Sequence, residues 1–236
     1  MSSAYTEDHL VEQPAIELLR DALQWEYLNC YDEWAAGASA LGREAKRDVV
    51  LVERLRPALV QLNPSLPNEA IEAAIEELAR DRSALSLVEA NREIYQLIRN
   101  GVKVQVHNQR DGGQETKAVK VINWDAPDAN DFFLSSQLWV SGELYTRRPD
   151  VVGFVNGLPL VLIEFKKPGV NLREGFDKNI CDYKDTIPQL FHFNSLILVS
   201  NGTQSKLGSV SAKWGHFCDW RKVESEEEAS ELSLET

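Results

Sequence analysis

Cysteine is scarce in this sequence, and long apolar runs are absent. The three cysteines, Cys30, Cys181 and Cys218, are odd in number and far apart among 236 residues. They match neither a disulfide framework nor the spacing of a zinc site, so we expect reduced thiols in a cytoplasmic protein. No run of 18 or more apolar residues occurs, and the first eight residues lack the basic head and apolar stretch of a secretory signal. We therefore expect no membrane partner.

Basic residues are outnumbered by acidic ones. The chain has 25 Lys and Arg against 37 Asp and Glu, and its formal net charge is −12. Residues 224–236 contain six glutamates and neither Lys nor Arg, so the rest of the chain is only half as acidic. We expect 224–236 to be a solvated acidic linker that follows a folded unit over 1–223. The mild acidity of that unit weakens a nucleic-acid-binding function without excluding it.

The first hundred residues carry the period of helices. Apolar residues from Ala15 to Leu23 recur at the spacing of one buried face, and Thr6 is a suitable N-cap before them. Asn63-Pro64 and Asn100-Gly101 are stop signals for two further helices. We predict three later helices, over 48–62, from Pro67 onward and over 87–99, and the first and last of them end at these stop signals.

After Gly101 the period changes to two residues, which indicates strands. Strands are predicted over 102–106, 117–123, 132–140, 151–155, 160–165 and 196–200, with one helix over 173–185. This order predicts an α/β fold with a mixed central sheet flanked by helices. Residues 1–100 would be mainly helical, 101–200 would form the sheet, and 201–223 would close it.

The chemically informative stretch runs from Arg148 to Lys166. Residues 158–163 are almost wholly apolar and predict a buried strand, yet Glu164 and Lys166 follow on one face of it. A buried strand does not accept charge without a reason, because an unpaired buried ion costs several kcal/mol. Asn156-Gly157 is a tight-turn signal and places Asp150 on the antiparallel partner strand.

The length of that turn decides which side chains meet. A two-residue loop would put Asp150 opposite Ile163, on the wrong face for Glu164. A three-residue loop over 156–158, with Gly157 as the left-handed bulge residue, would pair Asp150 with Glu164. We predict the bulged turn, because two carboxylates and an ammonium then converge.

Two carboxylates without a nearby His or Cys make a hard, oxygen-ligand site that suits Mg²⁺, with Mn²⁺ as a possible substitute. The carbonyl of Phe165 would add a backbone ligand. The metal would polarise a scissile phosphate, and Lys166 would orient the attacking water or stabilise the developing charge. The alternative is that Glu164 and Lys166 form a simple salt bridge where the strand surfaces, with Asp150 capping a turn.

Arg147 and Arg148 come just before Asp150, and arginines in such a place can hold phosphates. The sequence has no G-x-x-x-x-G-K-[ST] motif, so no ATP-binding loop is expected in it.

These residues, with others along the chain, resemble the nuclease domain at the N-terminus of the restriction (R) subunit of type I restriction–modification enzymes, a member of the PD-(D/E)xK nuclease superfamily. The likeness spans nearly the whole chain up to the acidic tail. It includes Glu12-Gln13-Pro14-Ala15-Ile16-Glu17-Leu18-Leu19, Leu41-Gly42-Arg43, Leu55-Arg56-Pro57-Ala58-Leu59, Leu62-Asn63-Pro64, Asn100-Gly101-Val102, Asn130-Asp131-Phe132, Arg147-Arg148-Pro149-Asp150, 154–166, Ile187-Pro188-Gln189-Leu190-Phe191, Ser200-Asn201-Gly202 and Trp220-Arg221.

The resemblance implies specific roles for site residues. Asp150, Glu164 and Lys166 match the catalytic positions of the family, and Glu12 matches an acidic residue that can reach the metal site. The family also carries a Gln-x-x-x-Tyr motif on the following helix. Here the two positions read Asn179 and Tyr183, which lie on one helical face. They would position DNA or support the site, although asparagine is one methylene shorter than glutamine.

The resemblance also implies the activity and its setting. It implies a restriction-endonuclease-like fold and a prokaryotic, cytoplasmic type I site-specific deoxyribonuclease that cleaves double-stranded DNA with Mg²⁺. ATP would serve only a motor region after the acidic linker, outside this chain, and the partners would be the modification (methyltransferase) and specificity subunits. Two alternatives stay open: a free-standing repair nuclease of the same fold, and a non-catalytic DNA-binding or subunit-docking module.

Overall fold

The computed structural model describes residues 8–107 and 113–220. The expected cap Thr6 and the predicted acidic linker 224–236 lie outside these residues. No helix among the described residues is long and apolar enough to cross a membrane.

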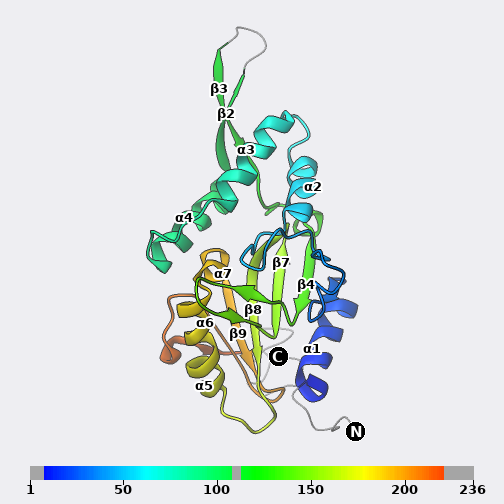
Figure 1. The fold of residues 1–236 in the computed structure, drawn as a ribbon, viewed down its shortest axis with the longest axis vertical. Coiled ribbons are helices and arrows are strands. Elements are labelled where there is room, and N and C mark those ends of the chain that lie inside the picture. Colours follow the sequence, from blue (N-terminus) through cyan, green and yellow to red (C-terminus); the bar gives the residue numbers. More distant parts are fainter. Residues whose placement is uncertain (1–7, 108–112, 221–236) are drawn as a thin grey trace.

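A mixed sheet forms the centre of the molecule, with helices on both sides of it (Figure 1). Pairing is parallel between β1 and β4 and between β8 and β9, and antiparallel elsewhere in the sheet. The seven strands, in spatial order, are β1 (Glu26–Asn29), β4 (Phe132–Ser136), β7 (Val151–Val155), β8 (Leu158–Phe165), β9 (Leu196–Ser200), β10 (Ser205–Gly208) and β11 (Cys218–Asp219). The predicted α/β class and mixed sheet are confirmed, and the architecture is consistent with the restriction-endonuclease-like fold.

The helices agree closely with the periodicity of the sequence. The first is continuous over 8–22 and mixes π-helical with α-helical turns, namely η1 (Asp8–Glu12), α1 (Gln13–Glu17) and η2 (Leu18–Ala22). The predicted helix over 173–185 is likewise continuous, as α5 (Leu172–Gly175), η4 (Phe176–Ile180) and α6 (Cys181–Thr186). The other helices are α2 (Val52–Leu62), α3 (Asn68–Ala79), α4 (Leu87–Asn100), α7 (Pro188–Phe193), and the short 3-10 turns η3 (Pro127–Ala129) and η5 (Trp214–His216).

One predicted helix begins later than expected. The interval 48–62 is helical only from Val52, because residues before it are engaged elsewhere. The Asp48 side chain accepts a hydrogen bond from the Ala45 amide, and the Leu51 amide donates to the carbonyl of Gly157 at 2.9 Å. These contacts hold 48–51 as a loop against the turn between β7 and β8.

Two predicted strands lie outside the central sheet, which corrects the expectation that 101–200 forms a single sheet. β2 (Val102–His107) and β3 (Gln114–Val119) pair only with each other in the described chain, and the second ends four residues earlier than predicted. Figure 1 shows the ribbon projecting beyond α3. Its alternating valines are buried beside the helices, so the ribbon satisfies its apolar face without joining the sheet.

The predicted strand over 132–140 is also interrupted. β4 ends at Ser136, and Gln137 takes a left-handed conformation with φ of 56°. Its amide donates to the carbonyl of Asp150 at 2.9 Å, after which the chain continues into β5 (Val140–Ser141), which pairs with β6 (Thr146–Arg147). Gln137 follows two serines, but nothing in the sequence shows that its backbone turns left-handed there.

Two clusters of buried side chains cover the two faces of the sheet. Leu158, Leu160 and Leu162 of β8 belong to the larger cluster, which includes α2–α7. Ile163 and Phe165 point the other way, into a smaller cluster with the first helix. Because side chains alternate along a strand, Glu164 lies on the face of the larger cluster.

Candidate active site

The turn between β7 and β8 has two residues, which corrects the predicted three-residue loop over 156–158. Asn156 and Gly157 have φ of 50° and 77°, and Leu158 pairs directly with Val155. Positive φ at both positions is the geometry of the tight hairpin turn that Asn-Gly favours. The buried Asn156 amide donates to the carbonyl of Val121 at 2.8 Å, which anchors the turn from inside.

The bulge that was predicted at the turn lies further along the pairing of β7 and β8. Phe154 pairs with Pro159 but Gly153 pairs with Val161, so β8 contains one extra residue between them. Proline cannot donate a ladder hydrogen bond, and strand bulges accommodate it. Beyond this shift Val151 pairs with Ile163, and one more step in the same register puts Asp150 opposite Glu164. The sequence reasoning thus reached the right juxtaposition through the wrong turn.

The three predicted catalytic side chains meet at the end of β8. The Phe165 amide donates to Asp150 Oδ2 at 2.8 Å, which fixes that carboxylate beside the strand. Lys166 Nζ lies 2.9 Å from Glu164 Oε1 and 2.6 Å from the Phe165 carbonyl oxygen. The ammonium therefore contacts two of the oxygens predicted as metal ligands.

Glu164 is 1% exposed, and the burial of its charge is compensated locally. The Lys166 side chain that pairs with it is 15% exposed, so the ion pair is screened only weakly by solvent. Separating such a pair leaves a buried charge without compensation and costs several kcal/mol. The site is therefore held together by its own electrostatics.

Glu12 approaches the site through an intermediary. Its carboxylate is buried and accepts hydrogen bonds from the Gln137 side-chain Nε2 at 3.0 and 3.1 Å. The backbone amide of Gln137 donates to the carbonyl of Asp150. Gln137 thus joins the first helix to the strand end that carries Asp150. Within the described residues, no three His, Cys, Asp or Glu side chains gather closely enough to form a metal-binding group by themselves.

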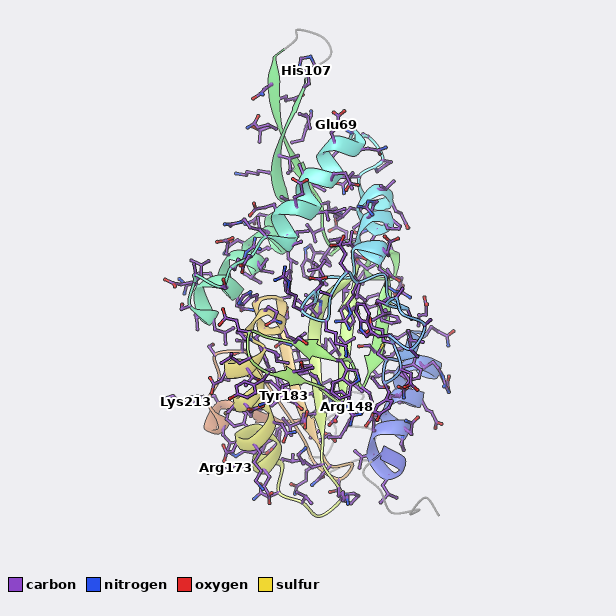
Figure 2. All side chains as sticks on the ribbon, in the orientation of Figure 1. Glu69, His107, Arg148, Arg173, Tyr183 and Lys213 are labelled. Carbon is purple, nitrogen blue, oxygen red and sulfur yellow. The ribbon has the colours of Figure 1, made fainter. Side chains whose placement is uncertain are left out.

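Asn179, in η4, and Tyr183, in α6, lie one turn apart on the continuous helix that covers this face; Tyr183 is labelled in Figure 2. Asn179 Nδ2 donates to the Tyr183 hydroxyl at 3.4 Å. Burial raises the pKa of Tyr183 far above its usual value, and the negative charges of Glu164 and Asp150 add to the effect. The hydroxyl therefore keeps its proton at any physiological pH and is a hydrogen-bond donor beside the two acids.

The two arginines before Asp150 have different environments. Arg147 forms a two-pronged ion pair with Asp182 on α6, with Nη2 to Oδ1 at 2.9 Å. The hydrogen bond from Arg147 lowers the pKa of Asp182 below its usual value. Arg148 instead lies against two aromatic rings.

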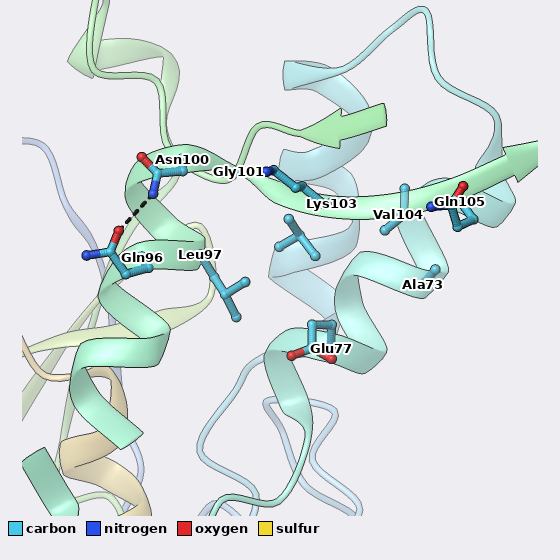
Figure 3. A pocket seen from close by; sticks show the side chains of 10 residues that line it. Ala73, Glu77, Gln96, Leu97, Asn100, Gly101, Lys103, Val104 and Gln105 are labelled. Atoms are coloured by element: carbon cyan, nitrogen blue, oxygen red, sulfur yellow. Dashed lines mark hydrogen bonds between the residues drawn. The ribbon is translucent and has the colours of Figure 1, made fainter. Parts of the chain in front are cut away.

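A pocket of about 630 Å³ is found elsewhere, between α3, α4 and β2 (Figure 3). Gln96 and Asn100 on its wall hydrogen-bond to each other at 2.8 Å. Glu77 and Lys103 also line it, but the converging acids and lysine lie at the end of β8. We take that end of the sheet as the candidate active site, because chemistry depends on convergent groups more than on hollow volume.

The family model "Type I restriction enzyme R protein N terminus" matches residues 4–216. The chain belongs to this family. It is 33% identical over 94% of its length to the type I restriction enzyme HindI endonuclease subunit of Haemophilus influenzae, and 30% identical over 97% to the putative MjaIXP endonuclease subunit of Methanocaldococcus jannaschii. It spans about a fifth of the length of these relatives, namely 21% and 22%.

In this R-protein N-terminal domain, the donor set at the end of β8 is chemically suited to a hard cation. Asp150 and Glu164 supply carboxylate oxygens and Phe165 a carbonyl oxygen, all anchored to one strand end. Mg²⁺ is commonly bound by one or two carboxylates with water and phosphate as the other ligands, so a third acid is not required. The residues present fit the metal that the sequence predicts.

Proposed function

We propose that this chain is the nuclease domain of a type I restriction enzyme R subunit and hydrolyses phosphodiester bonds of double-stranded DNA with Mg²⁺. The observation that carries the proposal is the convergence of Asp150, Glu164 and Lys166 at the end of a buried strand. The membership of the chain in the R-protein family supports it, as do relatives named endonuclease subunits.

Asp150, Glu164 and the Phe165 carbonyl would hold the metal, for which Mn²⁺ is a possible substitute. When bound, such an ion withdraws charge from a phosphate and lowers the pKa of water. Lys166 pairs with the Glu164 carboxylate and holds it close to the strand end, and its ammonium would stabilise negative charge on a phosphate. Tyr183 and Asn179 support Glu164 from the covering helix.

The rest of the enzyme would supply motion and specificity. The matched relatives are about five times longer than this chain, which leaves room for an ATP-driven motor. In our proposal the motor delivers DNA to this domain, while modification and specificity subunits choose the recognition site. A domain supplied with DNA in this way needs no strongly basic surface, which agrees with its net charge.

Metal binding by the chain tests the proposal directly. Calorimetric titration with Mn²⁺ and Mg²⁺ should give one saturable site, and Asp150→Asn should weaken it at least about ten-fold, because one of two charged ligands is lost. Asp125→Asn is the matched control, since it removes a carboxylate whose side chain is 94% exposed. Equal metal binding by the parent and Asp150→Asn would overturn the assignment.

A further inference from the structure

Arg148 is held between two aromatic side chains near the candidate active site. Its guanidinium carbon lies 4.9 Å from the centre of the Tyr31 ring and 5.1 Å from that of Trp139. The two ring centres are 6.3 Å apart, and Trp139 Nε1 donates to the carbonyl of Tyr31 at 3.1 Å. Lys46 Nζ lies 5.5 Å from the Trp139 ring centre, so a second cation adjoins the first.

A buried ion pair fixes this group from behind. Arg43 and Glu33 are paired, and neither side chain is exposed. Arg43 also donates to the carbonyl of Trp139 at 3.0 Å and to that of Lys46 at 3.4 Å. One buried guanidinium therefore joins the backbone segments that carry the tryptophan and the lysine, which makes the group a rigid part of the surface.

Arg148 and Lys46 have aromatic neighbours in place of a carboxylate partner at ion-pair distance. In the part of the chain that the structure describes, neither forms an ion pair with a carboxylate, whereas the neighbouring Arg147 is fully engaged by Asp182. A guanidinium held against aromatic rings by cation–π attraction keeps N–H donors available for hydrogen bonds, since the rings accept none in its plane. This geometry suits a two-pronged contact with a phosphate group.

We propose that Arg148, oriented by Tyr31 and Trp139 and assisted by Lys46, binds a backbone phosphate of the DNA strand beside the candidate active site. Only Pro149 separates Arg148 from Asp150, so a phosphate on this arginine would lie at the end of the sheet that carries the acids. This inference rests on the proposed function and gives the domain a contact that positions its substrate.

DNA binding by the whole 236-residue chain in EDTA tests this contact without catalysis. Fluorescence anisotropy with a labelled duplex oligonucleotide, between about 50 and 200 mM salt, gives the affinity and its salt dependence. Arg148→Gln should weaken binding about ten-fold at the lowest salt and reduce the slope of log K against log[salt] by about 0.9, the value for one phosphate contact. Arg148→Lys keeps the charge without the planar fork, so its affinity for DNA should lie between those of the parent and Arg148→Gln.

Two variants control for charge alone. Arg147→Gln removes the same charge one residue away, and Arg173→Gln removes an exposed one on α5, labelled in Figure 2. Both should bind DNA within about two-fold of the parent, with circular dichroism showing that each is folded. Equal losses in Arg147→Gln and Arg148→Gln, an unchanged Arg148→Gln, or no binding by the parent at low salt would each overturn the inference.

Failure here is distinguishable from failure of the proposed function. If the parent binds metal but Arg148→Gln binds DNA like the parent, the phosphate contact is wrong and the metal assignment is unaffected. If DNA binding depends on Arg148 but the chain takes up no Mn²⁺ or Mg²⁺, the contact stands and the nuclease assignment fails.

Discussion

In the proposed nuclease, Lys166 would perform two tasks that are usually separate. Its ammonium compensates the buried charge of Glu164, and it lies where charge on a reacting phosphate would need stabilisation. It also contacts the Phe165 carbonyl, so the lysine and a bound cation would share the same oxygens. Removal of the ammonium should therefore reduce catalysis without weakening metal binding.

Lys166→Met should leave Mn²⁺ affinity equal to or tighter than that of the parent, because a competing positive charge is gone. DNA cleavage by the reconstituted enzyme carrying this change should fall about 10²- to 10³-fold, the usual cost of losing one stabilising group. Calorimetry and a plasmid cleavage assay give the two numbers. Lys167→Met, which removes the exposed ammonium of the following residue, should cleave DNA at the parent rate. Cleavage retained by Lys166→Met would remove its assigned role.

Variants of Asn179 show whether its short side-chain amide can support Tyr183. Its hydrogen bond to the Tyr183 hydroxyl is long, at 3.4 Å. Asn179→Ala should slow DNA cleavage about two- to ten-fold, the range for one hydrogen bond, whereas Asn179→Gln, which restores an amide with greater reach, should cleave at least as fast as the parent. If the alanine variant cleaves at the parent rate, the asparagine is a surface amide without influence on Tyr183.

At the scale of elements, the turn between β7 and β8 depends on its glycine. A Cβ on Gly157 would lie 2.5 Å from the carbonyl oxygen of Leu51 and 2.8 Å from the amide nitrogen of Leu55, both backbone atoms. Gly37 has a similar φ of 82° but nothing within 4 Å of the equivalent position. A substitution at Gly37 therefore reports backbone strain alone, whereas one at Gly157 reports strain together with a steric clash.

Gly37→Ala should lower the free energy of unfolding by about 1 kcal/mol, the cost of a left-handed conformation. Gly157→Ala should lower it by more than about 2 kcal/mol, because α2 must also move away from the turn. Urea denaturation of both variants measures the difference. Equal effects would mean that the contact between the turn and α2 is looser than the structure has it.

The sequence predicts elements well where one pattern decides them. The helices over 87–99 and 173–185 were predicted almost to their ends, since their apolar spacing and the stop signal at Asn100-Gly101 agree. The break at Gln137 and the separate ribbon of β2 and β3 were missed, because both depend on distant partners. The bulge was expected at the turn but lies beside Pro159.

The candidate site was predictable for a related reason. Charged residues directly after an apolar strand contradict the local pattern, and such contradictions concentrate at functional places. Glu164 and Lys166 show this, and the structure brings Asp150 to them. The sequence pointed to Arg147 and Arg148 alike, and nothing in it separates the two, since Tyr31 and Trp139 reach Arg148 only through the fold.

At the scale of the whole molecule, α4 is attached to the sheet region at α7. Asn91 Nδ2 donates to the carbonyls of Phe191, His192 and Asn194, at 3.0, 3.1 and 2.9 Å. His192 is buried at this junction, and burial lowers its pKa, with the charge of Arg82 adding to the effect. The junction is therefore sensitive to acid.

Stability should depend on pH through this histidine. Above about pH 6.5, the ordinary pKa of histidine, it is neutral in both the folded and the unfolded chain. As the pH falls below that value the unfolded chain takes up the proton first, so the free energy of unfolding decreases until the lower, folded-state pKa is passed. His192→Gln should lose less stability between pH 7 and pH 5 than the parent, measured by urea denaturation. His216→Gln, at an exposed position, should follow the parent, and a shared pH profile for all three proteins would contradict the prediction.

The unequal sizes of the two buried clusters have a practical consequence. The first helix is fastened to the sheet mainly by the small cluster around Ile16, Val151 and Phe165, whereas the bulk of the domain is stabilised by the large one. Truncation of Ile16 should therefore loosen the helix that carries Glu12 while most of the hydrophobic interior stays intact. This domain can lose activity without unfolding, so a normal melting temperature does not show that a variant is active.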